Sequence, residues 1–166
     1  MKDRGEMIMS KSLIPLDYDY LIQNEYDVID YAMKHSDTFS VCITKKKPYS
    51  ARPPVFDFSE YIVPYAVDYI FEKSSRPVKF LGGNDPMIVC KVDRNSRRSL
   101  HELLGWFEPI EKNMPTDICF YRRGRVWFAT ISHERIAQIY EPTDENVKFF
   151  KDCGTPLIFN ETKKKR

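Results

Sequence analysis

The strongest constraint on the fold comes from two apolar runs that are separated by only a short basic turn. Residues 118–121 read ICFY and residues 126–131 read VWFATI, with RRGR at 122–125 between them. A run that is apolar at every position, without alternation, is typical of a strand that is buried on both faces. Gly124 supplies the positive φ that a tight turn between strands requires. The stretch therefore predicts a hairpin near the middle of a sheet that is covered by helices.

Helical and extended patterns follow one another along the rest of the chain. Apolar spacing and capping residues predict helices over 17–34, 59–73, 96–104, 133–140 and 143–154. Alternating β-branched and aromatic residues predict strands over 37–44, 78–81 and 86–93, the last two flanking a GGND turn. In the second helix, Pro64 is tolerated only in the first turn or at a kink. This order predicts an α+β fold, a single domain with a mainly antiparallel sheet and helices packed on it.

A length of 166 residues is enough for one self-sufficient core. We expect one domain over residues 16–155, preceded by an N-terminal arm at 1–15 and followed by a basic C-terminal tail at 156–166. A Pro-rich basic segment at 45–54 predicts a surface loop. Aromatic residues make up 14% of the chain, which predicts an interior rich in rings.

Charge is nearly balanced, with 26 basic and 24 acidic side chains and a formal net charge of +2. Four of the basic side chains lie in the terminal run at 163–166, so the body of the chain is close to neutral. Nucleic-acid binding and attraction to anionic lipid need clustered positive charge, and neither is favoured. No apolar run is long enough to span a membrane or to serve as a secretory signal. The sequence therefore predicts a soluble cytoplasmic protein with no membrane partner.

The candidates for catalysis are His133 and Glu134, which follow the second apolar run. A zinc protease needs HExxH, in which two histidines one helical turn apart bind one metal. His133 continues as HERIA and His101 as HELLG, so each lacks the second ligand. The plain interpretation is a pair of polar residues in the first turn of a capped helix. The functional interpretation is an acid and base pair at the end of a strand.

The cysteines give little sign of metal or nucleophilic chemistry. Structural zinc sites use close ligand pairs such as CxxC, whereas Cys42, Cys90, Cys119 and Cys153 are far apart. We therefore expect no metal site and no cofactor. Cys42, Cys90 and Cys119 have apolar or β-branched neighbours, so packing as small buried hydrophobes is their favoured role. The alternative is a nucleophilic pair of Cys119 with His133.

The arginines of the turn are the most pointed chemical feature of the sequence. Arg122, Arg123 and Arg125 have Tyr121 and Trp127 beside them. Together these side chains can form a surface of guanidinium groups and rings that binds a phosphate, an acidic protein or a single nucleic-acid strand. The plain alternative is a solvated turn, which requires polar residues in any case.

Two segments of the chain carry a resemblance. The runs DYDYLIQNEYDVIDYAMKHSDTFSVCITKKKPYS and DICFYRRGRVWFATISHE resemble a group of uncharacterised bacterial proteins, some of which are labelled stage III sporulation protein AH. The resemblance spans most of residues 17–152. It implies a bacterial source and brings no activity, ligand or catalytic residue.

Two main hypotheses for the function follow, with nucleic-acid binding as a third that the charge balance does not favour. The first is a non-catalytic interaction or regulatory protein, such as an immunity-type protein, that binds a protein partner through the arginine turn and the loop at 45–54. The alternative is a small hydrolase or nuclease in which His133 and Glu134 act and Arg125 steadies an anionic substrate. Convergence of this turn with His101, His133 and the second arginine group at 94, 97 and 98 on one cleft would favour the enzyme.

Overall fold

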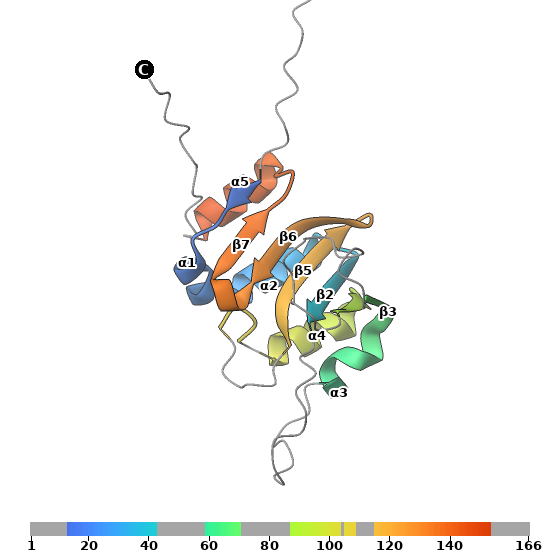
Figure 1. Ribbon diagram of the computed structural model, residues 1–166. Coiled ribbons are helices and arrows are strands. Elements are labelled where there is room, and N and C mark those ends of the chain that lie inside the picture. Colours follow the sequence, from blue (N-terminus) through green and yellow to red (C-terminus); the bar gives the residue numbers. More distant parts are fainter. Residues whose placement is uncertain (1–12, 43–58, 71–86, 104, 109–114, 154–166) are drawn as a thin grey trace, which may run out of the picture.

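The described residues form a seven-stranded antiparallel sheet (Figure 1). The computed structural model describes residues 13–42, 59–70, 87–103, 105–108 and 115–153. The strands are β1 (Ile14–Pro15), β2 (Thr38–Cys42), β3 (Ala66–Ile70), β4 (Met87–Lys91), β5 (Thr116–Arg122), β6 (Arg125–Ile131) and β7 (Ile136–Ile139). Their order across the sheet is β1-β7-β6-β5-β2-β4-β3, so the predicted hairpin of β5 and β6 lies inside the sheet.

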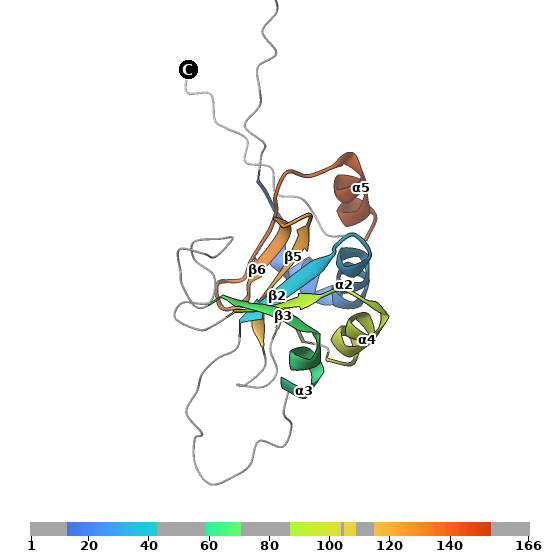
Figure 2. The same ribbon diagram turned by 90° about the vertical axis from the view of Figure 1, so that its right-hand side faces the viewer.

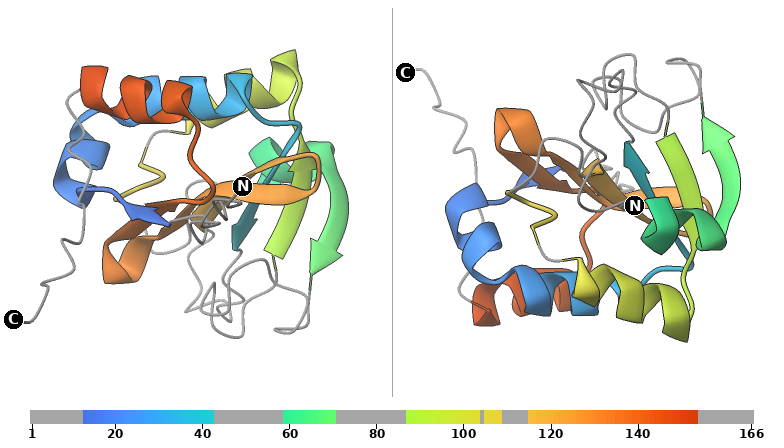
Figure 3. Two further views of the ribbon diagram at one scale, coloured as in Figure 1. Left: turned by 90° about the horizontal axis from the view of Figure 1, so that it is seen from above. Right: turned by 90° about the horizontal axis from the view of Figure 1, so that it is seen from below.

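Helices cover one face of this sheet. Figure 2 shows α2 (Glu25–Lys34), α4 (Arg94–Glu102) and α5 (Asp144–Asp152) on the same side of the strands, and Figure 3 shows them side by side as one layer. The shorter helices are α1 (Tyr18–Gln23) and α3 (Ser59–Ile62). The prediction of an α+β fold with a mainly antiparallel sheet and helices packed on it is confirmed. Within the described residues, no helix has the length and apolarity needed to cross a membrane.

The main core lies between the sheet and the helical layer, and it is rich in rings as predicted. Phe128 of β6 is its centre: its ring stacks on Phe120 of β5 with centroids 5.8 Å apart. The rings of Phe107 and Phe150 lie 6.2 and 5.8 Å from it. All four side chains are fully buried. Strand β6 is therefore held by packing against both its neighbouring strand and the helices.

The opposite face of the hairpin is buried as well. Successive side chains of a strand point to opposite faces, so the neighbours of Phe120 point away from the helical layer. Cys119, Tyr121, Ala129 and Ile131 belong to a second buried cluster. Burial on both faces explains why the two runs show no alternation, and the prediction drawn from that pattern is confirmed.

The helix predicted over 59–73 is wrong beyond its first turn. Helix α3 ends at Ile62, Val63–Tyr65 form a 3-10 turn, and the chain then enters strand β3. Pro64 has no N–H for a helical hydrogen bond, which stops the helix. Pairing with β4 then satisfies the backbone of residues 66–70. Residues 71–73 lie outside the described part of the chain.

The helix predicted over 133–140 is also wrong. Ser132–Glu134 form a single 3-10 turn, Arg135 adopts the left-handed conformation with φ 54°, and β7 begins at Ile136. The sequence IAQI fits an alternating pattern as well as a helical one. Strands β6 and β1 both offer hydrogen-bond partners to this segment, so sheet pairing overrides the local preference.

Other boundaries differ in detail. The helix predicted over 17–34 is divided at Asn24 into α1 and α2, with Asp17 as the cap of α1. Ile14 and Pro15, placed in the predicted arm, form β1. The strand predicted over 86–93 is β4, which pairs with β2 and β3. The remaining predictions for residues 1–12, 45–54, 78–81 and 156–166 fall outside the described residues.

Candidate functional site

An open hollow of about 200 Å³ lies between the hairpin turn and the start of α5. It is lined by Arg122, Arg125 and Trp127 from the hairpin, by Tyr140 and Glu141 from the segment after β7, and by Asn146 from the first turn of α5. These two groups are separated along the chain by the rest of β6 and strand β7. They meet because β7 pairs with β6, so the chain leaving β7 passes the base of the turn.

The hairpin turn itself has a defined backbone. Arg122 and Arg125 are opposite each other in the β5–β6 register, which leaves a two-residue turn of Arg123 and Gly124. Both turn residues have positive φ, 52° and 73°, as a type I′ turn requires. The backbone N–H of Arg123 donates to Asp37 Oδ2 at 2.6 Å. The turn thus places the side chains of Arg122 and Arg125 next to each other at the hollow.

Arg122 is held by two contacts inside the protein. Its Nε atom donates to the carbonyl oxygen of His35 at 2.8 Å, and its guanidinium carbon lies 5.8 Å from the centroid of the Trp127 ring. Trp127 is only 7% exposed, and its Nε1 donates to Ser36 Oγ at 2.8 Å. The C-terminal end of α2 therefore fixes both the arginine and the ring beneath it.

The start of α5 is tied to the same end of α2. Thr143 caps the helix by accepting from the N–H of Asn146, and Asn146 Nδ2 donates to the hydroxyl of Tyr31 at 3.1 Å. His35 Nε2 lies 3.5 Å from Glu145 Oε1. The ring of Tyr31 stacks on Phe149 with centroids 3.7 Å apart. The far wall of the hollow is thus part of the packed helical layer.

The other two arginines of the turn are held less firmly. Arg125 Nη1 lies 3.8 Å from Glu141 Oε2, and the two side chains are 78% and 48% exposed. Arg123 is exposed at the tip of the turn. Exposed ion pairs of this kind contribute little to stability.

Tyr121 does not join this surface. It is 7% exposed and lies in the second buried cluster, where its hydroxyl is 2.7 Å from Ser40 Oγ. Burial raises the pKa of Tyr121 well above its usual range. The ring that the sequence placed beside the arginines therefore stabilises the sheet from its other face.

A Tyr121→Phe variant tests this placement. It removes the hydroxyl contact with Ser40 and should lower the free energy of unfolding by about 1 kcal/mol, measured by urea denaturation. The substitution should not affect the binding of a partner at the arginine turn, because Tyr121 does not line the hollow. Tyr20→Phe is the matched control, because the Tyr20 side chain is 44% exposed and should show no measurable change. Equal stability of the Tyr121→Phe variant and the wild type would contradict the buried contact.

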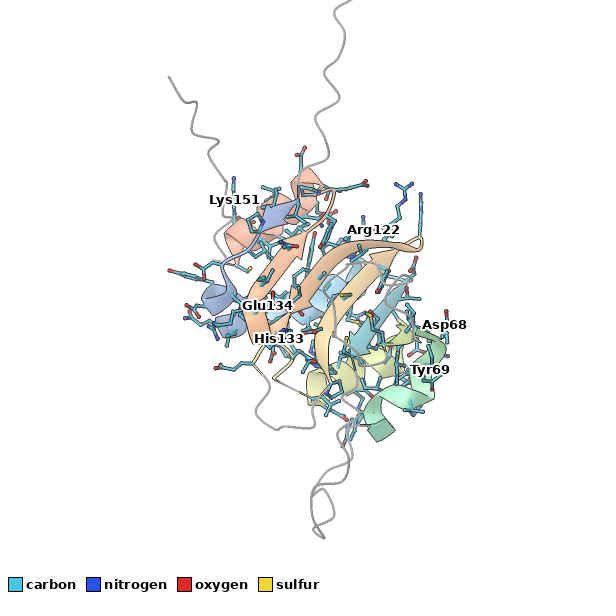
Figure 4. All side chains as sticks on the ribbon, viewed as in Figure 1. Asp68, Tyr69, Arg122, His133, Glu134 and Lys151 are labelled. Carbon is cyan, nitrogen blue, oxygen red and sulfur yellow. The ribbon has the colours of Figure 1, made fainter. Side chains whose placement is uncertain are left out.

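His133 and Glu134 lie at the opposite end of β6 from the hollow (Figure 4). A seven-residue strand separates Arg125 from this end, a span of about 20 Å. The imidazole Nε2 is 3.6 Å from Glu134 Oε1, and the two side chains are 66% and 49% exposed. The pair therefore sits in water, without the arginine that the enzyme hypothesis required beside it.

His101 and Arg97, one member of the second arginine group, form a separate cluster between α2 and α4. Asp30 Oδ1 lies 3.1 Å from Arg97 Nη2 and 3.4 Å from His101 Nε2. Lys34 Nζ reaches the other oxygen of Asp30 at 2.6 Å. Burial alone would raise the pKa of Asp30, but these hydrogen bonds and the Lys34 charge hold it below its usual value. The cluster joins two helices, and the two arginine groups and two histidines do not share a cleft.

Three of the four cysteines lie where a nucleophile would be inaccessible. Cys42, Cys90 and Cys119 are fully buried. Burial raises the pKa of Cys90 to about 12 and that of Cys119 well above its usual value, so neither forms the reactive thiolate readily. Among the described residues, no group of three or more His, Cys, Asp or Glu side chains is placed to hold a metal ion.

Sequence reasoning missed the residues that complete the hollow. Tyr140 is the last residue of the helix predicted over 133–140, most of which is in fact β7, and Glu141 and Asn146 follow it. The only signal was the capping pattern at Thr143, which marks the start of α5 correctly. It gave no indication that this cap lies beside the arginine turn. Comparisons with protein-family models, curated proteins and solved structures give no match for this chain.

Proposed function

We propose that this chain is a non-catalytic interaction protein, of a regulatory or immunity type, whose protein partner binds at the arginine turn and the adjacent hollow. The observation that carries the proposal is the fixed position of the Arg122 side chain. Its guanidinium is fixed beside an open hollow by His35 and Trp127. Arginine, tryptophan and tyrosine are enriched among the residues that contribute most of the binding energy of protein interfaces.

The surroundings of the turn favour a protein over a nucleic acid as the partner. The arginines of the turn are accompanied by the acidic residues Asp37, Glu141, Asp144 and Glu145. A polyanion requires clustered positive charge without such carboxylates. A protein surface of mixed charge matches this arrangement. The alternative hydrolase or nuclease has no comparable support, because His133 and Glu134 are exposed and lie at the far end of β6.

Affinity capture tests the proposed surface. The wild-type chain and an Arg122→Ala, Arg123→Ala, Arg125→Ala triple variant are used as baits in a lysate of the source organism. We expect the wild type to retain at least one protein that the triple variant loses. An Arg94→Ala, Arg98→Ala double variant is the matched control, because these arginines are exposed on α4. It should retain the wild-type set of proteins.

The triple variant needs a check of its fold, since Arg122 has contacts inside the protein. An Arg123→Ala, Arg125→Ala double variant avoids this difficulty, because both side chains are exposed. It should weaken capture without changing the thermal unfolding midpoint. Identical sets of captured proteins for all four baits would contradict the proposal.

A further inference from the structure

Arg122 is fixed in place, yet part of its hydrogen-bonding capacity is unused. Its Nε atom is occupied by the carbonyl oxygen of His35. Among the residues that the structure describes, none accepts a hydrogen bond from either Nη atom of Arg122. The side chain is half-buried and lines the hollow. A ligand that binds these Nη atoms therefore meets a donor group that is already oriented, which lowers the entropic cost of binding.

The charges around the hollow limit which anion can bind there. Arg125 has Glu141 as its neighbour, and the first turn of α5 carries Asp144 and Glu145. Of the two arginines that line the hollow, Arg125 has a carboxylate partner and Arg122 has none among the described residues. Coulomb energy is proportional to charge, so a dianionic phosphate group doubles both its attraction to Arg122 and its repulsion from these carboxylates. Arg122 alone can neutralise a single negative charge, whereas a second negative charge would face the carboxylates without a counter-charge of its own. The hollow therefore suits a group with a single negative charge.

The geometry points to a carboxylate pocket: we infer that the hollow binds one carboxylate group of the protein partner, anchored by the Nη atoms of Arg122. The planar fork of a guanidinium matches the two oxygens of a carboxylate. Val126 and Tyr140, both partly buried, offer apolar surface to the carbon atoms that carry the group. The carboxylate comes either from an Asp or Glu side chain or from a chain end. This inference rests on the proposed function, for which it names the chemistry.

Nuclear magnetic resonance on the full chain tests the pocket directly. The Nε–H signal of Arg122 is followed while small probes are added to the ¹⁵N-labelled protein. N-acetylglutamate α-amide carries only a side-chain carboxylate, N-acetylalanine carries only a chain-end carboxylate, and methyl phosphate represents the dianion. N-acetylglutamine amide is the neutral control. We expect a saturable shift with at least one of the two carboxylates, at lower concentration than with methyl phosphate, and no saturable shift with the neutral amide.

The probe that saturates first identifies the source of the carboxylate. Tighter binding of the glutamate derivative assigns the pocket to an acidic side chain, and tighter binding of N-acetylalanine assigns it to a chain end. Tighter binding of methyl phosphate, or no saturable shift with either carboxylate, would overturn the inference.

Two variants separate binding from folding. Arg122→Lys removes the fork, so carboxylate affinity should be lost or weakened by about tenfold. Because this variant lacks the Arg122 signal, binding to the variant and to the wild type is compared through the Nε1–H signal of Trp127, which lines the same hollow. Glu141→Gln leaves Arg122 untouched and removes a neighbouring negative charge. It should tighten carboxylate binding by about threefold at low salt. Unchanged carboxylate affinity in the Glu141→Gln variant would contradict a binding site at this hollow.

The results also distinguish this inference from the proposed function. If protein capture depends on the arginine turn but no carboxylate probe binds, the pocket assignment fails and the interaction surface stands. If a carboxylate probe binds but all baits capture the same proteins, the pocket stands and the proposed interaction surface fails.

Discussion

Replacing Phe128 with Ala is expected to lower the free energy of unfolding by about 3–5 kcal/mol. Phe128 is fully buried and is surrounded by the rings of Phe107, Phe120 and Phe150. Truncation removes the transfer free energy of the ring and leaves a cavity in a packed layer between sheet and helices. Because β6 lies inside the sheet, its neighbours on both sides restrict how far that cavity can close. We therefore expect the loss of unfolding free energy to lie in the upper part of this range.

Urea denaturation followed by tryptophan fluorescence measures this loss. Phe128→Leu is the matched control, since it keeps most of the apolar volume and should cost about 1–1.5 kcal/mol. A loss below about 1 kcal/mol for Phe128→Ala would mean that the residue does not form the centre of a close-packed core. Equal losses of unfolding free energy for Phe128→Ala and Phe128→Leu would lead to the same conclusion.

Replacing Glu25 with Ala is expected to lower the free energy of unfolding by about 2–3 kcal/mol. The two carboxylate oxygens of Glu25, on α2, accept the backbone N–H groups of Gly105 and Phe107, each at 2.8 Å. These bonds fix the segment that carries Trp106, whose side chain is fully buried. Without the carboxylate, these two backbone donors lose their partner. The segment then keeps its packing and the hydrogen bonds of the Phe107 carbonyl with the Tyr18 hydroxyl and of Trp106 Nε1 with the Leu100 carbonyl.

Two controls isolate the carboxylate in this experiment. Glu25→Gln keeps one oxygen acceptor and should cost about half as much, because hydrogen bonds to a charged acceptor are roughly twice as strong as neutral ones. Asp27→Ala changes an exposed acid on the same helix and should stay within about 0.5 kcal/mol of the wild type. Chemical denaturation of all three variants gives the comparison. A loss for Glu25→Ala as small as that for Asp27→Ala would show that the two bonds do not support the fold.

The central hairpin was predictable because the runs at 118–121 and 126–131 lack the polar alternation of a strand with one exposed face. Phe120 and Phe128 face the helices, whereas Cys119 and Ala129 face the second cluster. A short, uninterrupted apolar run fits a buried strand better than a buried helix when it is rich in aromatic and β-branched residues and is bounded by a turn such as that at Gly124. The fold class follows from this hairpin and the capped helices around it.

Strands β3 and β7 were not predictable in this way because their partners decide their state. Each follows a short helical turn, and the local pattern of each fits a helix as well as a strand. Hydrogen bonds to β4 and to β6 make the choice. The partner of β3, strand β4, follows only after an intervening segment of the chain. No local feature of either strand shows which partner it will have.

The candidate site was predictable in part. Arg122 and Arg125 were identified from the turn, and the structure places both at the hollow. The partners that fix Arg122 come from the end of α2 and were missed, because a backbone carbonyl such as that of His35 has no sequence signature. The sequence does not place Glu141 and Asn146 at the hollow, because the segment before them fits a helix as well as the strand that it forms.

The two-residue reversal between β5 and β6 restricts how relatives of this chain can diverge. Arg122 and Arg125 face each other only because two residues of positive φ separate them. Exchange of a side chain at either position would alter charge and leave the pairing intact. Insertion of one residue would shift the following strand by one step and turn its side chains to the opposite face. We therefore expect this surface to evolve by substitution at fixed length, with insertions and deletions excluded from the turn.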